Sequence, residues 1–433
     1  MTTERRAKKA KYSEQEHARR KVSFQSFPES KASKREVSKS SAKKTDVSTE
    51  SATSGKEKLE PSLSSSFKVI AGSYERLLYG LQGTVSVVSP ASSELQWTLK
   101  PIFIFPAHVS CIKSVAASPQ GGKWLATGSG DEIIKVWDLR RRKEVGGLMQ
   151  HEGSITHLTF PSRSHLISAS EDGTLCLFRA RDWAVLRSLK GHKGRVNSVS
   201  VHPSGKIALS VGKDRTLYMW DLMRGRRAAS VKLGFEGELV RWSITGSLLI
   251  VQYQKIINVY STDLALLHTM EHASRIHDVK FAQRVNGEGE VVLVAAEDRK
   301  TTVYDVCPDS GTFLRAIAYL IGHGNRVKAL DTIRIALPST TRCSTTLLSS
   351  VSSDGTINVY DLSFLPPRLS EGIVERSPVV QYDSKGSRLT CVTLADGDVD
   401  RLEPPVHNKG AKREREPESE DEDEWEGFET EIT

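Results

Sequence analysis

Between Phe67 and about Asp400 the chain consists of short apolar runs in which hydrophobic and polar residues alternate. Gly, Asp, Ser and Asn separate these runs every few residues. Alternation with a period of two places one set of side chains on each face of a strand, and the separating residues favour turns. The pattern therefore predicts an all-β region of many short strands.

One thirteen-residue stretch recurs in this region, with an aromatic residue six positions after a turn. The copies are "TGSGDEIIKVWDL" (127–139), "SASEDGTLCLFRA" (168–180), "SVGKDRTLYMWDL" (210–222), "VAAEDRKTTVYDV" (294–306), "SVSSDGTINVYDL" (350–362) and, without the acid, "IVQYQKIINVYST" (250–262). The aromatics are 41, 42, 40, 44 and 56 residues apart. This matches the roughly 40–45 residues of a four-stranded propeller blade. The last interval is longer because residues 331–346 are expected to form an inserted loop.

A histidine precedes four of the Asp turns, and His272 has the comparable position before Asp298. With these histidines the repeats resemble the WD-repeat family of β-propellers from Phe67 onward. The resemblance implies that each His bonds the turn Asp and a Ser or Thr, which in turn reaches the Trp of the third strand. The matching sets are His108/Thr127/Asp131/Trp137, His151/Ser168/Asp172/Phe178, His192/Ser210/Asp214/Trp220 and His323/Ser350/Asp354/Tyr360. The set that ends in Phe178 must be one bond shorter, because phenylalanine has no indole N–H.

These sets are predicted to be structural rather than catalytic. A nucleophilic site needs one unique base, orienting group and nucleophile at one substrate position, whereas this combination repeats in blade after blade. The turn carboxylate instead accepts hydrogen bonds from nearby backbone N–H groups. No GxxxxGK[ST], HExxH or GxGxxG motif is present, and no unrepeated pair of acids suggests a hydrolase. We therefore predict no enzymatic activity, no cofactor and no small-molecule substrate.

About seven blades are expected in a single propeller over residues 67–400. Six turn-and-aromatic units are visible, and residues 67–89 and 377–397 supply further strands at the two ends. Joining these terminal strands in one composite blade would leave no free sheet edge. Two smaller propellers would need a linker, which the even spacing does not show.

The two ends of the chain carry opposite charge. Residues 1–60 contain sixteen Lys and Arg against nine Asp and Glu, whereas residues 414–433 contain one Arg against eleven acids. Such segments cannot bury enough apolar surface to offset chain entropy. We expect a disordered basic Ser/Lys-rich tail over 1–66 and a disordered acidic tail over 401–433. The basic tail is suited to RNA phosphates or to nuclear import.

Two arginine-rich stretches follow Trp-Asp pairs, and the acidic tail contains two aromatic residues. The arginine-rich stretches are expected at the start of outer strands or in the loops that lead to those strands. They either protect sheet edges from pairing or contact RNA or an acidic partner. The tail aromatics belong either to a solvated spacer or to a docking segment for a basic partner. The candidate contact residues are Arg140, Arg141, Arg142, Lys143, Arg224, Arg226, Arg227, Trp425 and Phe428.

Other compartments and chemistries have little support in the sequence. No apolar run reaches the roughly 18 residues of a membrane helix, and the N-terminal residues are charged. The five cysteines are far apart and lack metal-ligand spacing, which argues against a disulfide framework and a zinc site. The net charge of +8 favours an acidic partner. A reducing cytosol or nucleus is expected.

A narrower resemblance rests on "AGSYERLLYGL" (71–81), the early His108 blade, the changed turn at Gln254 and "SRLTCVTLADG" (387–397). These features resemble the p21-activated-kinase-interacting-protein family, whose fungal members are nucleolar factors in large-subunit ribosome assembly. The resemblance implies a non-catalytic scaffold in the nucleus and nucleolus that docks on pre-ribosomal assembly proteins, ribosomal proteins and rRNA. The alternative is a signalling scaffold that binds and restrains a p21-activated protein kinase.

Overall fold

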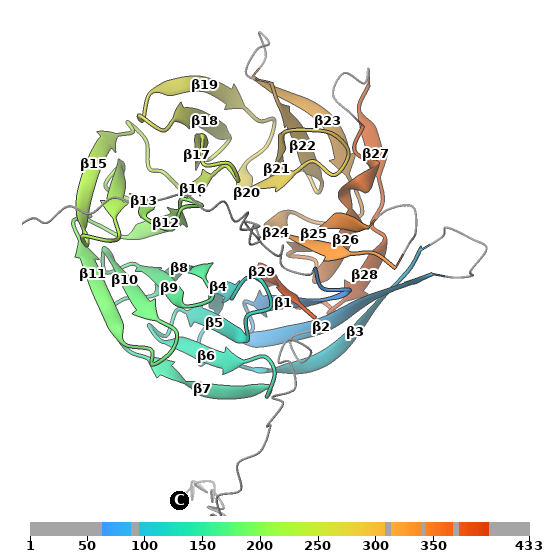
Figure 1. The fold of residues 1–433 in the computed structure, drawn as a ribbon, viewed down its shortest axis with the longest axis horizontal. Helices are drawn as coiled ribbons and strands as arrows, with labels where there is room; N and C mark the ends of the chain where they lie inside the picture. Colours follow the sequence, from blue (N-terminus) through green and yellow to red (C-terminus); the bar gives the residue numbers. More distant parts are fainter. Residues whose placement is uncertain (1–62, 88–94, 308–312, 339–342, 367–371, 398–433) are drawn as a thin grey trace, which may run out of the picture. The chain divides into compact units, whose positions relative to one another are not determined.

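The computed structural model describes residues 63–87, 95–307, 313–338, 343–366 and 372–397. Within these ranges the chain forms seven β-sheets arranged as a ring (Figure 1). Six sheets have four strands and one has five. This confirms the predicted all-β propeller of about seven four-stranded blades. Most of the expected basic tail and the whole acidic tail lie outside the described residues, although Ser66 of the former begins a strand.

Blades 1 to 4 each consist of four consecutive strands numbered from the channel outward, whereas blades 5, 6 and 7 also contain strands from elsewhere in the chain. Blade 1 contains β4 (Ile112–Ala117), β5 (Trp124–Ser129), β6 (Ile134–Asp138) and β7 (Lys143–Leu148), and blade 2 contains β8 (Ile155–Ser162), β9 (His165–Ser170), β10 (Thr174–Arg179) and β11 (Val185–Lys190). Blade 3 contains β12 (Val196–Val201), β13 (Ile207–Gly212), β14 (Thr216–Asp221) and β15 (Arg226–Lys232), and blade 4 contains β16 (Leu239–Trp242), β17 (Leu248–Tyr253), β18 (Ile256–Ser261) and β19 (Leu266–Glu271). Blade 5 contains β20 (Ile276–Gln283), β21 (Glu290–Ala296), β22 (Thr301–Val306), β23 (Leu314–Leu320) and β27 (Val374–Arg376). Blade 6 contains β24 (Val327–Ala336), β25 (Ser344–Ser352), β26 (Thr356–Asp361) and β28 (Val380–Asp383). Blade 7 contains β29 (Leu389–Asp396), β1 (Ser66–Ser73), β2 (Leu77–Val87) and β3 (Leu95–Pro106). A short 3-10 helix, Leu362–Phe364, follows β26.

Blade 7 closes the ring with strands from both ends of the described chain. Its order is β29-β1-β2-β3, and β29 pairs antiparallel with β1 in a register that places Phe67 opposite Asp396. The innermost strand therefore comes from the C-terminal side and the other three from the N-terminal side. Because each of these strands has a neighbour, neither chain end leaves a free edge at the closure.

The predicted inserted loop at 331–346 is wrong. Most of that stretch belongs to β24 and β25, which pair continuously from Asp331 opposite Ser349 to Ala336 opposite Ser344. The longer interval between aromatics thus reflects a longer hairpin. The chain also departs from simple succession after β26, because β27 adds to blade 5 in parallel with β23 before β28 returns to complete blade 6.

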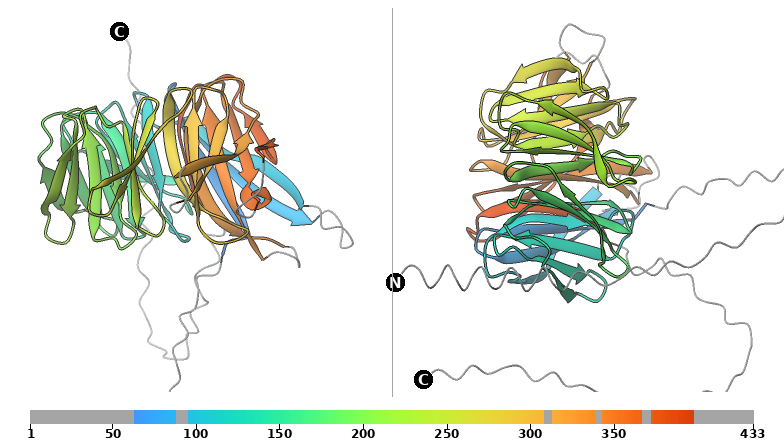
Figure 2. Two further views of the ribbon diagram at one scale, coloured as in Figure 1. Left: turned by 90° about the horizontal axis from the view of Figure 1, so that it is seen from above. Right: turned by 90° about the vertical axis from the view of Figure 1, so that its left-hand side faces the viewer.

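The strands run across the thickness of the ring, so turns gather on two faces (Figure 2). We call the face that carries the turns between second and third strands, including Asp131 and Asp214, the Asp face; the connections between blades also lie there. The turns between third and fourth strands lie on the opposite face, which we call the Arg face after Arg140, Arg141 and Arg224. No helix among the described residues has the length and hydropathy to cross a membrane.

The hydrophobic core lies between neighbouring blades rather than in one centre. One cluster joins Ala169 and Leu175 of blade 2 to Val196, Val199 and Trp220 of blade 3. Burial of such side chains stabilises each by roughly 1.5–3 kcal/mol relative to exposure. Packing of adjacent sheets therefore holds the ring together, and the inner strands stay in place around the channel.

Candidate functional site

Complete hydrogen-bonded sets occur in blades 1 and 3. In blade 1, His108 contacts Asp131 through Nδ1 at 2.9 Å and the Thr127 hydroxyl through Nε2 at 2.8 Å, and Trp137 donates its indole N–H to the same hydroxyl at 3.0 Å. In blade 3, His192 contacts both Asp214 oxygens at 3.0 and 2.9 Å. It also contacts Ser210 at 2.7 Å, and the Trp220 indole donates to Ser210 at 2.8 Å.

The set in blade 2 keeps the histidine contacts but ends at its hydroxyl. His151 lies 2.9 Å from Asp172 and 2.6 Å from the Ser168 hydroxyl. Its Nδ1 also lies 3.1 Å from the Thr174 hydroxyl. Phe178 is buried at the aromatic position and offers no donor to Ser168.

The set in blade 6 differs from the implied arrangement. His323 contacts the Ser350 hydroxyl at 2.6 Å, but its other ring nitrogen contacts Thr356 at 2.7 Å and is 3.9 Å from Asp354. Asp354 instead accepts backbone N–H groups, among them that of Gly324 at 2.7 Å. The Tyr360 hydroxyl donates to the Ile321 carbonyl at 2.9 Å. Substituting tyrosine for tryptophan thus redirects the last bond to the backbone.

The electrostatics of these sets suit a neutral, buried imidazole. The side chains of His108, His151, His192 and His323 have no exposed surface. Burial lowers the pKa of His108 and His192 although Asp131 and Asp214 oppose that shift, and burial lowers the pKa of His323 to about 4. A neutral ring in blades 1 and 3 can donate from Nδ1 to the carboxylate and accept at Nε2 from the hydroxyl. Every polar atom of the set is then used within the blade.

The repeat is interrupted in blade 4. Strand register places Leu233 and Val251 where blade 3 has His192 and Ser210, since Val251 pairs with Val240 as Ser210 pairs with Val199. Both are buried in an apolar cluster with Tyr260. The turn is also shorter, because Tyr253 pairs directly with Ile256 across Gln254 and Lys255. The offset of six residues at Gln254 therefore does not preserve the turn geometry of the other blades.

The blade 5 histidine does not reproduce the repeated contact either. His272 Nδ1 lies near atoms of Ser274, with the Ser274 carbonyl at 3.2 Å. One buried oxygen of Asp298 has no hydrogen-bond partner in the part of the chain that the structure describes. An Asp at the turn position is therefore not sufficient to form the histidine contact, and sequence spacing alone could not distinguish this blade from the others.

The two arginine-rich stretches lie on the Arg face and the adjoining outer strands. The Asp138 carboxylate accepts the backbone N–H groups of Arg140 and Arg141 at 2.8 and 3.1 Å, and Asp221 accepts that of Arg224 at 3.0 Å. The Asp of each Trp-Asp pair thus shapes the turn that presents the arginines. Arg141, Arg142, Lys143, Arg224, Arg226 and Arg227 are exposed, and Arg140 is partly exposed. Trp425 and Phe428 lie outside the described residues.

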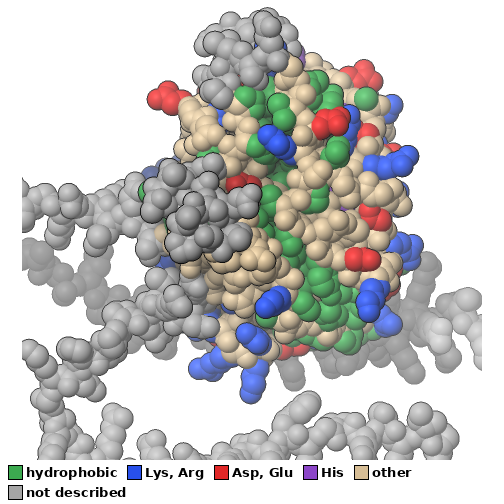
Figure 3. Space-filling view, turned by 90° about the vertical axis from the view of Figure 1, so that its right-hand side faces the viewer, with side chains coloured by type: hydrophobic (Ala, Val, Ile, Leu, Met, Phe, Trp, Pro, Cys, Tyr) green, Lys and Arg blue, Asp and Glu red, His purple; other side chains and the backbone are tan. Residues whose placement is uncertain are grey.

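Sequence reasoning missed Arg187 as a member of this basic surface. It is exposed on β11, the outer strand of blade 2, and packs against the turn of blade 3. A methyl group added to Gly225 would lie only 2.6 Å from Arg187 Cδ. A comparison of the outer-strand residues of successive blades would have identified Arg187, because β7, β11 and β15 follow one another along the rim (Figure 1). On the side that includes β27 and β28, by contrast, the visible Lys and Arg are scattered among acidic and hydrophobic side chains (Figure 3).

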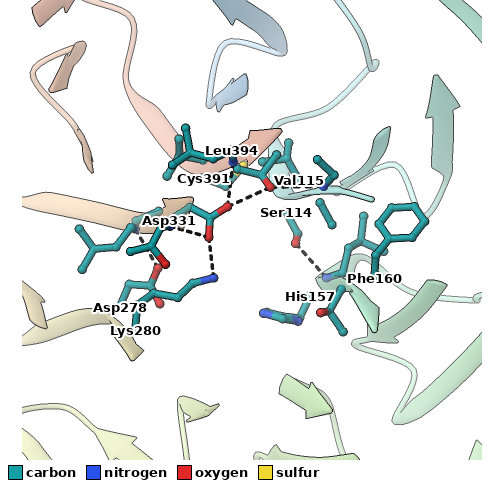
Figure 4. A pocket seen from close by; sticks show the side chains of 18 of the residues that line it. Ser114, Val115, His157, Phe160, Asp278, Lys280, Asp331, Cys391 and Leu394 are labelled. Atoms are coloured by element: carbon teal, nitrogen blue, oxygen red, sulfur yellow. Dashed lines mark hydrogen bonds and ion pairs between the residues drawn. The ribbon is translucent and has the colours of Figure 1, made fainter. Parts of the chain in front are cut away.

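A cavity of about 730 Å³ occupies the channel between the inner strands. Asp331 on β24 lies at its wall, where it pairs with Lys280 at 2.9 Å and accepts the Leu394 N–H at 2.8 Å (Figure 4). It also accepts the Thr393 hydroxyl at 3.1 Å. One carboxylate therefore ties β20, β24 and the closing strand β29 together.

Further polar groups line the same channel. Arg241 pairs with Asp278 at 3.2 Å and contacts His157 Nε2 at 3.1 Å. Burial, with the positive charges of Arg241 and Lys280, lowers the pKa of His157 well below its usual value. His157 Nδ1 has no hydrogen-bond partner among the described residues. The pairs Arg241–Asp278 and Lys280–Asp331 place charges of both signs on the channel wall, which is therefore polar.

Neither metal binding nor disulfide bonding is supported by the described residues. No group of three or more His, Cys, Asp or Glu side chains there is placed to hold a metal ion. Cys111, Cys176, Cys343 and Cys391 are free thiols. The arrangement as a whole offers a rigid scaffold with exposed turns, which suits binding rather than bond-making chemistry.

Comparison with known proteins finds WD-repeat relatives. The model of the WD domain, G-beta repeat, matches residues 99–138, 142–179 and 183–221. "p21-activated protein kinase-interacting protein 1-like" from Danio rerio is 33% identical over 333 residues, which cover 77% of this chain and 81% of the relative. The Homo sapiens "p21-activated protein kinase-interacting protein 1" is 36% identical over 70% of this chain and 73% of its own. "Protein MAK11" from Saccharomyces cerevisiae is 30% identical over 81% and 87%, respectively.

Proposed function

The chain belongs to the WD-repeat propeller family that includes the p21-activated protein kinase-interacting proteins, and from this membership we propose a non-catalytic scaffold in nucleolar assembly of the large ribosomal subunit. The scaffold docks on pre-ribosomal proteins and on rRNA. The resemblance of the sequence to nucleolar assembly factors motivates the process, and the basic surface of blades 1 to 3 supports contact with RNA. The proposed residence is the nucleolus.

The observation that carries the proposal is the set of arginines held on neighbouring turns and outer strands. Arg141, Arg187, Arg224 and Arg226 are all exposed, and they come from three successive blades. A guanidinium presents a planar fork of donors that fits phosphate oxygens. Contacts to the phosphate backbone need no base sequence and position a protein on folded RNA. The surface is therefore suited to rRNA that also contacts assembly proteins.

A binding role also agrees with the inaccessibility of the repeated histidines. Each has a fully buried side chain, so none can reach a substrate at the surface. Their hydroxyl partners are committed to bonds within the same blade. The repeats support the scaffold and leave recognition to exposed turns and outer strands.

Charge reversal on the basic surface tests the RNA contact. We expect Arg224→Glu/Arg226→Glu to weaken binding to rRNA fragments roughly tenfold at moderate salt and to make the salt dependence shallower, because fewer counterions are released. The matched control is Arg299→Glu/Arg315→Glu, which reverses two exposed charges on blade 5. Equal affinities of both variants and the original chain would contradict the proposed surface.

A second experiment tests the assembly role itself. In growing cells the full chain is expected in the nucleolus and, on a sucrose gradient, with particles that precede the large subunit. Removal of residues 1–60, with their excess of Lys and Arg, should reduce RNA association in a salt-dependent manner. A chain that stays in the light gradient fractions of growing cells would refute an assembly role.

The names of the relatives favour a second candidate, a signalling scaffold that binds and restrains a p21-activated protein kinase. The relatives from Danio rerio and Homo sapiens are both named for interaction with such a kinase. Direct binding of the purified chain to a kinase regulatory region, together with residence outside the nucleolus, would favour this candidate over ribosome assembly.

A further inference from the structure

The connection between blades 3 and 4 carries an unusual exposed aromatic residue on the Asp face. Phe235 lies between β15 and β16 with 64% of its surface exposed, and its ring centroid is 5.6 Å from that of Tyr253. The two rings border a cavity of about 720 Å³. We call this cavity the blade 3/4 groove. It occurs where blade 4 has replaced the polar histidine set by apolar residues, so the repeated structural contacts do not account for its side chains.

The charged side chains that line the groove are unequally paired. Arg195 pairs with Glu236 at 3.0 Å, and Arg275 pairs with Glu238 at 2.8 Å. Three further cations, Lys213, Arg215 and Lys255, are exposed there, and no ion pair within 4.0 Å involves them among the described residues. Glu271 is the one remaining carboxylate of the lining. The groove thus combines one exposed ring, that of Phe235, with an excess of positive charge.

We propose that the blade 3/4 groove binds residues 418–429 of this chain. This segment, "ESEDEDEWEGFE", contains eight Asp and Glu and no Lys or Arg. Its aromatics, Trp425 and Phe428, can pack on the exposed ring of Phe235, since aromatic pairs stabilise contacts beyond the area they bury. Its carboxylates match Lys213, Arg215 and Lys255. The proposal goes beyond the scaffold function and does not depend on it.

The chain has the length to make this contact. Gly397, the last described residue, bonds Ser66 at the end of the inner strands on the Arg face. The 28 residues from there to Trp425 span up to about 92–101 Å when extended. A blade with six-residue strands is only about 20 Å deep, so the segment can pass around the ring to the Asp face. Docking would make the segment an internal competitor for any acidic partner of the groove.

Zero-length carbodiimide cross-linking of the full chain tests the contact, because it joins a carboxylate directly to a lysine amine. Mass spectrometry should find residues 418–429 joined to Lys213 or Lys255. A mixture of nitrogen-15-labelled and unlabelled protein should yield links within one isotopic form. Links mainly between the two forms would show that a second copy fills the groove and would overturn the proposal.

Two variants and one control separate this contact from general charge attraction. Trp425→Ala/Phe428→Ala and Phe235→Ser keep all the lysines, and each should lower the yield of these links roughly fivefold because a ring contact is lost. Arg141→Glu/Arg142→Glu, on the Arg face, should leave the yield unchanged. Unaltered melting temperatures of the variants exclude misfolding. Links that form mainly to Lys143 or to the N-terminal lysines, or yields insensitive to the aromatic variants, would refute the proposal.

Discussion

Asp214 and Asp298 occupy equivalent turns but make different contacts. Asp214 accepts from the His192 ring and from the backbone of Lys193 and Thr216, whereas one buried Asp298 oxygen lacks a partner within the described ranges. We expect Asp214→Ala to reduce the free energy of unfolding by about 1–3 kcal/mol, because it leaves a buried imidazole N–H unpaired. Asp298→Ala should cost much less. Denaturant unfolding of both measures the difference, and RNA affinity of the folded Asp214→Ala protein should be unchanged. Equal destabilisation, or loss of RNA binding with normal melting, would contradict the structural role.

Acid should weaken the ring through its buried histidines. The pKa of His323 is about 4 in the folded chain because of burial, against about 6.5 when unfolded. Because the pKa of His323 is lower in the folded chain, neutral His323 contributes fully to the free energy of unfolding above pH 6.5. This contribution is lost as the pH falls toward 4, by about 3 kcal/mol in all. His323→Gln should be less stable at pH 7, and its melting temperature should approach that of the original chain at pH 4.5. A difference in melting temperature between His323→Gln and the original chain that stays constant from pH 7 to pH 4.5 would rule out titration of His323.

At the scale of single strands, two glycines of blade 7 lie opposite aromatic rings. Gly83 of β2 pairs with Phe67 and Gly80 with Phe103. A methyl group on Gly83 would lie 2.1 Å from the buried Phe67 ring. We expect Gly83→Ala to destabilise the chain by about 1–3 kcal/mol through overpacking. Gly147→Ala on the exposed β7 is the matched control, because the atom nearest to the added methyl is a side-chain carbon at 3.2 Å. Thermal unfolding compares the two, and equal melting temperatures would refute the packing argument.

The strand elements also show what could be read from the sequence. The Asp-to-aromatic spacing predicted the blades well, because a turn and its following strand are local features. It failed at Gln254, where a two-residue turn keeps the same spacing, and at 331–346, where polar residues extend a hairpin. The parallel addition of β27 to blade 5 depends on a contact between distant segments. The blade 3/4 groove arises likewise from turns of two blades, and no single repeat contains its signal.

At the scale of the whole molecule, hydrophobic clusters pack each blade against its neighbour, and polar contacts in the channel join the inner strands of different blades. Asp331 bonds groups on β20 and β29, and Asp278 accepts the Leu330 N–H of β24. Such bonds cross from one inner strand to the next, so loss of one inner strand leaves buried polar groups of its neighbours without partners. This makes closure a property of the complete ring rather than of blade 7 alone.

Truncations on either side of Gly397 test that closure. A chain that ends at Arg388 lacks β29, which exposes the edge of β1 and removes the partners of Asp331 in Thr393 and Leu394. We expect this chain to lose its cooperative thermal transition and to aggregate, because an open ring presents unpaired strand edges. A chain that ends at Gly397 keeps every described strand and should melt within a few degrees of the full chain. Circular dichroism and light scattering during heating measure both outcomes. A cooperative, soluble transition of the shorter chain near that of the full chain would show that the ring does not require the composite blade.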